Sequence, residues 1–141
     1  MDMQGITTVA DTSFVVALLN GKDSAHPTAI RTYAEQGTIL LPQTVLAEVA
    51  YLLSRDAGVL VLIKFLKSLT ASRFQLESLL DEDIEGIAEI LEQYQDSRID
   101  FVDASVMVIA ERYNLNLALT LDRRDFGIYR PSSGLMFTLK P

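Results

Sequence analysis

The sequence predicts an α/β fold in which helices cover both faces of a parallel sheet. Short apolar runs alternate along the chain with segments whose apolar residues recur at helical spacing, which is typical of parallel sheets. The chain of 141 residues is long enough for one domain with its own core, and no linker or internal repeat divides it. We therefore expect a single domain spanning residues 1–141.

The expected strands are short apolar runs, several of them rich in β-branched residues. Pro42 stops the second run, and the last run has the character of an edge strand. In chain order the expected strands are Ile6–Ala10, Thr38–Leu41, Phe74–Leu76, Leu117–Leu121 and Leu135–Leu139.

The expected helices follow from the helical spacing of apolar residues and from capping signals. The expected N-caps are Ser24, Thr44, Asp81 and Asp100, and Asn114 can take the left-handed conformation after the last helix. In chain order the helices run after Asp11 to about Leu19, from Ser24 to Glu35, from Thr44 to about Ser54, from Val59 to Leu69, from Asp81 through Leu91 and from Asp100 to Tyr113.

The composition is that of a globular protein, with 49% hydrophobic and 22% charged residues. No apolar run is long enough to span a bilayer, and the first residues lack the basic segment of a signal peptide. Cys is absent, which excludes disulfides, zinc–thiolate sites and thiol nucleophiles. We therefore expect a cytoplasmic protein that makes no membrane contact.

The formal net charge of −7 argues against a protein that grips nucleic acid through its overall charge. It leaves room for a site that approaches phosphates through bound metal. His26 is the one histidine and lies away from every acidic motif, so we interpret it as a surface or capping residue. The sequence contains neither the P-loop nor the Rossmann glycine fingerprint of nucleotide binding.

Two acids follow expected strands directly. Parallel strands place Asp11 and Asp122 at the same edge of the sheet, where open α/β sheets bind their ligands. Thr12 and Thr120 bring hydroxyls beside them, and Asp125 is a candidate alternative or outer ligand. For Asp122 or Asp125 alone, an ordinary turn aspartate is an equally good interpretation.

Two further acids come from helices. Glu48 is the one charge between Pro42 and Leu53, so its helix should be largely buried, and its carboxylate needs a cation partner or a place on a cleft wall. A plain salt bridge to an arginine is the alternative. Asp103 lies in a first helical turn at the edge of the apolar stripe, whereas Asp100 is better placed as the N-cap. Favourable charge at a helix N-terminus is the alternative for Asp103.

Carboxylates that lie within a few Å of one another repel unless a cation neutralises them. Oxygen ligands are those that Mg²⁺ and Mn²⁺ prefer. We therefore predict that one or two such ions are held by Asp11, Glu48, Asp103 and Asp122. The acids between Asp81 and Glu92 are instead expected on a solvated helix face.

The same stretches resemble the PIN-domain family, and within it the VapC toxins of prokaryotic toxin–antitoxin pairs. The stretches are Val9-Ala10-Asp11-Thr12-Ser13, Glu48 on its apolar helix, Ile99-Asp100-Phe101-Val102-Asp103-Ala104, and Leu119-Thr120-Leu121-Asp122-Arg123-Arg124-Asp125-Phe126. The resemblance covers nearly the whole chain. It implies a three-layer α/β/α PIN-like domain with a mainly parallel five-stranded sheet. It also implies an endoribonuclease that depends on Mg²⁺ or Mn²⁺ and whose four acids match the four named above.

The resemblance further implies an RNA substrate, a small antitoxin partner and a homodimer. Candidate phosphate contacts are Lys22, Arg55, Arg123, Arg124 and Arg130, from which we select Arg123 and Arg124. The segment Val59–Leu69 carries more apolar residues than one helix face needs. It is either a buried core helix or the wall of a groove that receives an antitoxin helix.

Other function classes share some of these features. A receiver-type signalling domain is also a small α/β protein with an acidic magnesium site, but it needs paired acids after its first strand. Here Asp11 stands alone and Glu48 lies on a helix. A housekeeping PIN nuclease and a catalytically idle PIN scaffold are the alternatives within the family.

Overall fold

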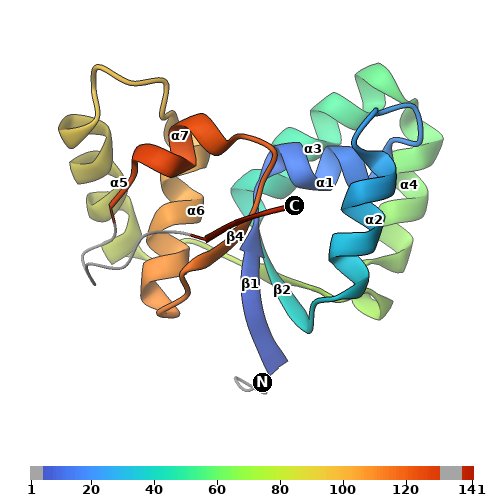
Figure 1. Ribbon diagram of the computed structural model, residues 1–141, viewed down its shortest axis with the longest axis horizontal. Helices are drawn as coiled ribbons and strands as arrows, with labels where there is room; N and C mark the ends of the chain where they lie inside the picture. Colours follow the sequence, from blue (N-terminus) through green and yellow to red (C-terminus); the bar gives the residue numbers. More distant parts are fainter. Residues whose placement is uncertain (1–4, 131–137) are drawn as a thin grey trace.

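The computed structural model describes residues 5–130 and 138–141, in which strands alternate with helices (Figure 1). The strands are β1 (Ile6–Ala10), β2 (Thr38–Pro42), β3 (Phe74–Glu77), β4 (Leu117–Leu119) and β5 (Thr138–Lys140). The helices are α1 (Thr12–Leu19), α2 (His26–Ala34), α3 (Gln43–Asp56), α4 (Val59–Ser68), the 3₁₀ turn η2 (Leu69–Ala71), α5 (Asp81–Gln93), α6 (Phe101–Arg112) and α7 (Arg123–Ile128). Residues 135–137 of the expected last strand lie outside the described residues.

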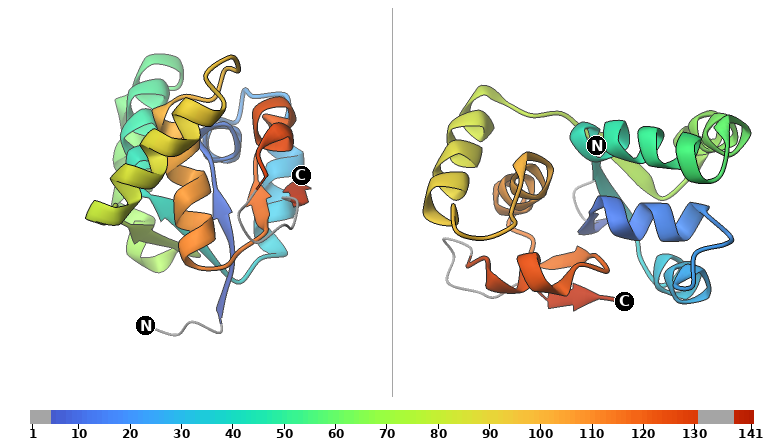
Figure 2. Two further views of the ribbon diagram at one scale, coloured as in Figure 1. Left: turned by 90° about the vertical axis from the view of Figure 1, so that its left-hand side faces the viewer. Right: turned by 90° about the horizontal axis from the view of Figure 1, so that it is seen from above.

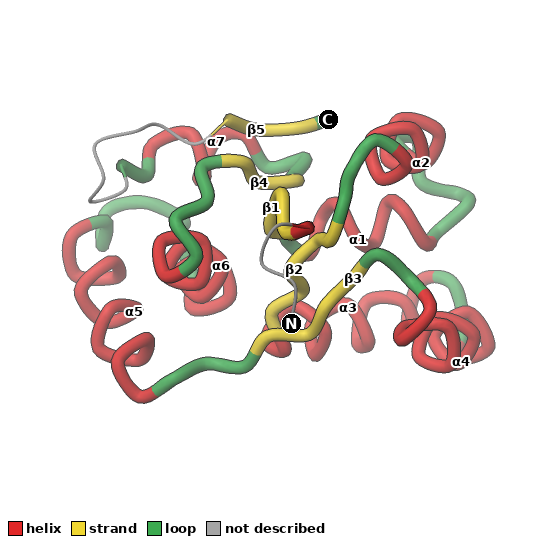
Figure 3. The backbone as a smooth tube through the Cα atoms, turned by 90° about the horizontal axis from the view of Figure 1, so that it is seen from below, coloured by secondary structure: helices red, strands yellow, loops and turns green. Residues whose placement is uncertain are grey.

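The described strands form one five-stranded sheet in the order β3-β2-β1-β4-β5, and every neighbouring pair is parallel. β1 is central, because Val9 pairs with Leu40 of β2 on one side and with Ala118 of β4 on the other. Viewed from below, α1 to α4 lie on one side of the strands and α5, α6 and α7 on the other (Figure 3). This arrangement confirms the predicted α/β fold with a parallel sheet. The chain runs from β1 to β3 in one direction and from β3 to β5 in the other, and the usual right-handed crossover then places the two sets of helices on opposite faces.

Helix α6 is the most deeply buried helix of the described chain. All residues from Ala104 to Ala110 are buried, because α6 contacts β1 and β2 as well as α5 and α3. A helix that is covered on several sides needs apolar residues around most of its circumference. None of the described helices combines the length and the apolar character that crossing a bilayer requires.

Three of the expected N-caps are wrong, namely Ser24, Thr44 and Asp81. The helices concerned begin after Ala25, Pro42 and Leu80, and none of these positions has a side-chain cap. At α5 the backbone N–H of Leu80 instead donates to Asp83, over 2.8 Å. Asp100 caps α6 as predicted, and Asn114 has the expected positive φ of 56°.

Helices α3 and α4 are more exposed than their apolar content suggests. Along α3 a single stripe is buried, formed by Val45, Val49 and Leu53, and Tyr51 is 65% exposed. The expectation that the helix of Glu48 is largely buried is therefore wrong. The interpretation of α4 as a core helix is also wrong, because Phe65 is its buried residue and much of its remaining apolar surface faces outward.

The chain after β4 differs from the expectation as well. The expected strand Leu117–Leu121 ends at Leu119, and Asp122 then caps the short helix α7, which the sequence pattern did not predict. A helix of six residues is too short to show a clear apolar period.

A nearly buried ion cluster joins β3, α5 and α6. The guanidinium of Arg112 lies 2.9 Å from Glu77 Oε1 and 2.9 Å from Asp83 Oδ2, and the Tyr113 hydroxyl donates to Glu77. The interpretation of Asp83 as a solvated acid is wrong, because it is 6% exposed. The cluster ties the start of α5 and the end of α6 to the edge strand β3.

We predict that Arg112→Met lowers the free energy of unfolding by roughly 2–4 kcal/mol, because two nearly buried carboxylates lose their cation. Urea denaturation followed by circular dichroism measures the change. The matched control is Arg55→Met, since the Arg55–Asp56 pair is exposed on the surface and its loss should leave the free energy of unfolding unchanged within error. Equal losses in the two variants would contradict a structural role for the cluster.

Candidate metal centre

The four acids predicted to bind metal line a single cleft at the carboxyl edge of the sheet, with a volume of about 390 Å³. Seen from above, α1 and α3 lie to one side of the strands and α6 and α7 to the other (Figure 2). The cleft is lined by Asp11, Thr12, Ser13, Glu48, Leu52, Arg98, Asp100, Asp103, Asp122 and Asp125. The structure thus brings the four acids together, while their role as metal ligands remains a prediction.

Asp11 is held rigidly at the end of the central strand. It is 4% exposed and caps α1, with Oδ1 accepting hydrogen bonds from the Phe14 backbone N–H at 3.0 Å and the Ser13 hydroxyl at 2.8 Å. The Thr120 hydroxyl donates to Oδ2. Ser13 Oγ in turn accepts from the Leu121 backbone N–H at 2.9 Å. The end of β1, the start of α1 and the end of β4 are therefore locked to one carboxylate.

Glu48 is half-buried and faces the cleft from α3. No Lys or Arg of the described chain forms an ion pair with it, so the alternative of a salt bridge is wrong and the cleft-wall prediction is confirmed. One turn earlier, the Thr44 hydroxyl lies 2.6 Å from the Ser105 hydroxyl of α6. This bond ties the helix of Glu48 to the helix of Asp103.

Asp103 and Asp100 form a reciprocal capping box at the start of α6. Asp100 Oδ1 accepts from the Asp103 backbone N–H at 2.9 Å, and Asp103 Oδ2 accepts from the Asp100 backbone N–H at 3.1 Å. Asp103 is half-buried and lines the cleft. The prediction that Asp100 is the cap is thus confirmed, while Asp103 as a metal ligand stays a prediction.

Asp122 and Asp125 belong to the start of α7. Asp122 Oδ1 accepts from the Asp125 backbone N–H at 3.2 Å, and the Asp122 backbone N–H donates to Thr120 Oγ1 at 2.8 Å. Asp122 does not follow a strand directly as expected, since Thr120 and Leu121 separate it from β4. It nevertheless reaches the same cleft as Asp11, and Asp125 lies buried beside it.

The electrostatics of the cleft disfavour the ionised forms of its own carboxyl groups. Burial raises the pKa of Asp11 to about 6, although three hydrogen bonds to its carboxylate oppose the shift and the charge of Asp122 adds to it. Burial also raises the pKa of Asp103 to about 8, and the neighbouring charges of Asp100 and Asp11 contribute. Burial and Asp122 raise the pKa of Asp125. A cation bound among these carboxyl groups would lower their pKa values and favour their ionised forms.

The side chains of the cleft suit a hard divalent cation, because every titratable group there that can ligate a metal is a carboxylate. Among the described residues, no group of three or more Asp, Glu, His or Cys side chains is already arranged to hold an ion. Asp11, Asp103 and Asp122 each accept one backbone N–H, which leaves other lone pairs of their carboxylates for an ion. The buried Thr12 hydroxyl lines the cleft without a hydrogen-bond partner among the described residues, and a water carried by an ion would satisfy it. The residues therefore fit such an ion.

Two polar residues of the cleft were not selected from the sequence. Ser13 supports Asp11 through its hydroxyl, and Arg98 brings a guanidinium from the loop before α6. Of the arginines that were selected, Arg124 has no hydrogen bond or ion pair among the described residues, although its charge acts on Asp125, whereas Arg123 donates to the Pro141 carbonyl. His26 lies outside the cleft, half-buried at the start of α2, with Nδ1 2.8 Å from the Ala17 carbonyl oxygen.

The chain belongs to the PIN-domain family, whose sequence profile matches residues 8–130. It is 32% identical over 134 residues to Ribonuclease VapC26 of Mycobacterium tuberculosis (strain ATCC 25618 / H37Rv), a match that covers 94% of this chain and 99% of that protein. The chain is thus a homologue of the VapC ribonucleases, as the resemblance in the sequence implies.

Two solved structures share the fold. The crystal structure of Mycobacterium tuberculosis VapC20, a Sarcin-Ricin loop cleaving toxin, superposes with a TM-score of 0.77 at 26% identity and covers 84% of this chain and 92% of that one. VapBC2 from Rickettsia felis, bound to a DNA fragment from its promoter, gives a TM-score of 0.65 at 19% identity over 96% and 97% of the two chains. The second likeness concerns the fold alone.

We predict that the metal-free protein loses stability as the pH rises from about 4 through about 6. The folded pKa of Asp11 exceeds the usual value of an aspartate, about 3.9, so the folded state binds this proton more tightly than the unfolded state does. Between these pH values Asp11→Asn should gain roughly 2–4 kcal/mol in free energy of unfolding relative to the wild type. Urea denaturation in EDTA at both pH values measures the difference. A difference that does not depend on pH would show that Asp11 is not a strained carboxylate.

Proposed function

We propose that this protein is a Mg²⁺- or Mn²⁺-dependent endoribonuclease, the toxin of a VapBC-type pair, that acts on RNA in the cytoplasm. The observation that carries the proposal is the convergence of four carboxylates from four different elements on one cleft. Full-length similarity to Ribonuclease VapC26 supports the reaction type. The ligands that we propose for one or two ions are Asp11, Glu48, Asp103 and Asp122.

The residues of the chain orient the reaction. A divalent cation held there supplies Lewis-acid activation of water and neutralises charge on the phosphate. Asp11 is fixed by Ser13 and Thr120, so it presents its carboxylate in one orientation and loses little entropy on binding. The Thr12 hydroxyl, which has no hydrogen-bond partner within the described part of the chain, can orient a water molecule in the cleft. No histidine base is needed.

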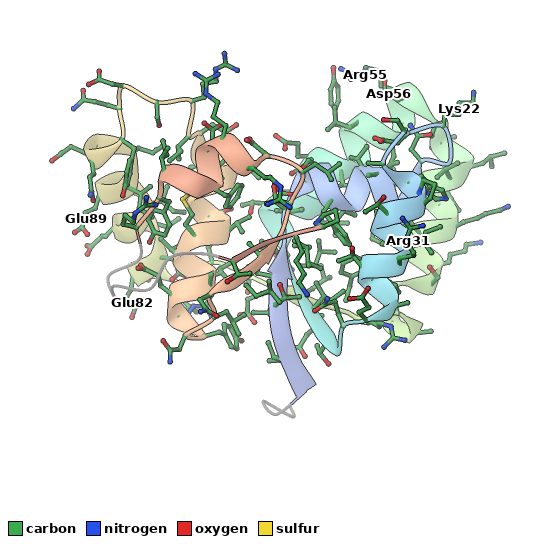
Figure 4. The ribbon with its side chains drawn as sticks, in the orientation of Figure 1. Lys22, Arg31, Arg55, Asp56, Glu82 and Glu89 are labelled. Atoms are coloured by element: carbon green, nitrogen blue, oxygen red, sulfur yellow. The ribbon has the colours of Figure 1, made fainter. Side chains whose placement is uncertain are left out.

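We expect Asp11→Asn to reduce RNA cleavage to background while the fold is retained, and EDTA to do the same to the wild type. Cleavage is assayed by sequencing RNA 5′ ends after induction of each form, and the fold is checked by circular dichroism. The matched control is Asp56→Asn, an exposed aspartate at the end of α3 that should cleave as the wild type does (Figure 4).

The outcomes separate the family alternatives. Cleavage by a well-folded Asp11→Asn variant, in preparations free of contaminating nuclease, would remove Asp11 from the mechanism. A wild type that binds Mn²⁺ but cuts no RNA would be an idle scaffold. Growth that continues normally while RNA is cut would favour a housekeeping nuclease.

We also propose that a small antitoxin covers the outer apolar face of α4, and that the protein forms a homodimer. The exposed residues of this face are Val59 (56% exposed), Leu60 (71%), Ile63 (38%) and Leu66 (45%). A partner helix can bind apolar residues at this spacing, either in a groove or on a face. The toxin–antitoxin character of VapBC2, which has the same fold, supports the existence of a partner.

We expect Leu60→Glu to preserve RNA cleavage and to abolish co-purification with the small protein encoded beside this one. The measurement is pull-down of the tagged chain after co-expression. Lys64→Gln on the same helix is the matched control and should retain the partner, because its side chain is exposed and polar. Retention of the partner by Leu60→Glu would place the antitoxin on another face.

A further inference from the structure

A second cavity adjoins the carboxylate cleft. It has a volume of about 390 Å³ and lies between the loop that precedes α6 and helix α7. Its lining residues are Asp96, Ser97, Arg98, Arg124, Asp125 and Ile128. Arg98 and Asp125 line both hollows, so a chain that leaves the cleft in this direction enters the second cavity directly.

The two arginines of this cavity differ from the other arginines of the described chain. The other six each have a partner for the guanidinium: Arg31 with Thr28, Arg55 with Asp56, Arg73 with the Gln36 carbonyl, Arg112 with Glu77 and Asp83, Arg123 with the Pro141 carbonyl, and Arg130 with the Gly127 carbonyl. Within the described residues, Arg98 and Arg124 have neither a hydrogen bond nor an ion pair. The charges of both arginines act on Asp125 of the same cavity. Their N–H donors form no hydrogen bond within the described residues and are thus available to a ligand.

The walls that carry these arginines are fixed before any ligand arrives. Ser97 Oγ donates to the Tyr94 carbonyl at 2.7 Å and accepts from the Ile99 backbone N–H at 3.1 Å, which shapes the loop of Arg98. The Tyr94 and Tyr129 rings pack with centroids 5.9 Å apart, and the Arg130 backbone N–H donates to the Tyr94 hydroxyl. The loop before α6 is therefore attached to the end of α7, and the two arginines are carried by connected segments.

We propose that Arg98 and Arg124 form a phosphate subsite that holds the RNA backbone beside the proposed cleavage site. Guanidinium groups are planar forks of donors that match phosphate oxygens, and charge-assisted bonds of this kind are strong. The chain carries a net charge of −7, so RNA must be drawn in by local groups rather than by the overall charge. The subsite rests on the proposed nuclease function, since its value lies in positioning RNA against the four carboxylates.

One acid on the wall provides an independent test. Asp96 is exposed and lines the cavity without an ion pair among the described residues, so its charge opposes an incoming phosphate. Removing this charge should strengthen RNA binding, whereas removing either guanidinium should weaken it. Opposite changes from residues of the same cavity distinguish a phosphate subsite from a general effect on stability.

The experiment measures fluorescence anisotropy of a short single-stranded RNA, in the cleavage-deficient Asp11→Asn background with Mn²⁺ present. We expect Arg98→Gln and Arg124→Gln each to weaken binding by roughly five- to tenfold. The double variant should also lower the slope of log affinity against log salt by about 1.4, or about 0.7 for each lost phosphate contact. Asp96→Asn should strengthen binding by about two- to fivefold.

Arg31→Gln is the matched control, because Arg31 lies on α2, far from α7, and should leave both affinity and salt slope unchanged (Figure 4). In the cleavage-competent chain the arginine variants should raise KM with little change in kcat. Unchanged RNA affinity and slope in the double variant would overturn the subsite, even if the wild type cuts RNA. A wild type that binds RNA through these arginines without cutting it would instead overturn the nuclease proposal and leave the subsite standing.

Discussion

The structure depends on one buried carboxylate that several elements share. Asp11 ends the central strand, caps α1 and accepts the Thr120 hydroxyl, so the geometry of β1, α1 and β4 converges on two oxygen atoms. Burial makes the ionised form of this group costly, as its raised pKa indicates, and the neighbouring acids add to the cost. Burial and the neighbouring carboxylates offset part of the stability that the hydrogen bonds of Asp11 provide. Function is the better explanation for the arrangement.

The topology of the sheet explains how distant acids meet. Because every strand pairing is parallel, the chain leaves β1 and β4 at the same edge, and the helices that follow or precede them begin there. Two hydroxyl contacts then fix the walls of the cleft. Ser13 joins the start of α1 to Leu121, and Thr44 joins α3 to Ser105 of α6. Each contact lies within a few residues of a proposed ligand.

The sequence predicted those parts of the fold that depend on local patterns. The strand before Asp11 and the Asp100 cap follow from an apolar run and from capping chemistry, and both agree with the structure. The exposure of α4 could not be predicted, because apolar content alone does not reveal which neighbours cover a helix. Helix α7 was missed since six residues give too short a period.

In the candidate site, too, some residues could be predicted from local sequence patterns and others depend on the tertiary structure. Asp11 could be found because a lone acid at the end of a buried strand is unusual, and Glu48 because it is isolated in an apolar helix. Arg98 gives no such signal. It is an exposed residue in an irregular loop, and only the tertiary structure places it beside Asp125 and Arg124. The sequence therefore identified the carboxylates and missed part of the surface that surrounds them.

The central claim is that these carboxylates tolerate one another through a shared divalent ion. The most direct measurement is anomalous diffraction from crystals of the protein soaked in Mn²⁺. The account predicts an anomalous peak inside the cleft, within coordinating distance of oxygens from Asp11 and at least two of Glu48, Asp103 and Asp122. A cleft without such a peak while Mn²⁺ is bound elsewhere on the molecule, or carboxylates that stay apart at saturating Mn²⁺, would contradict it.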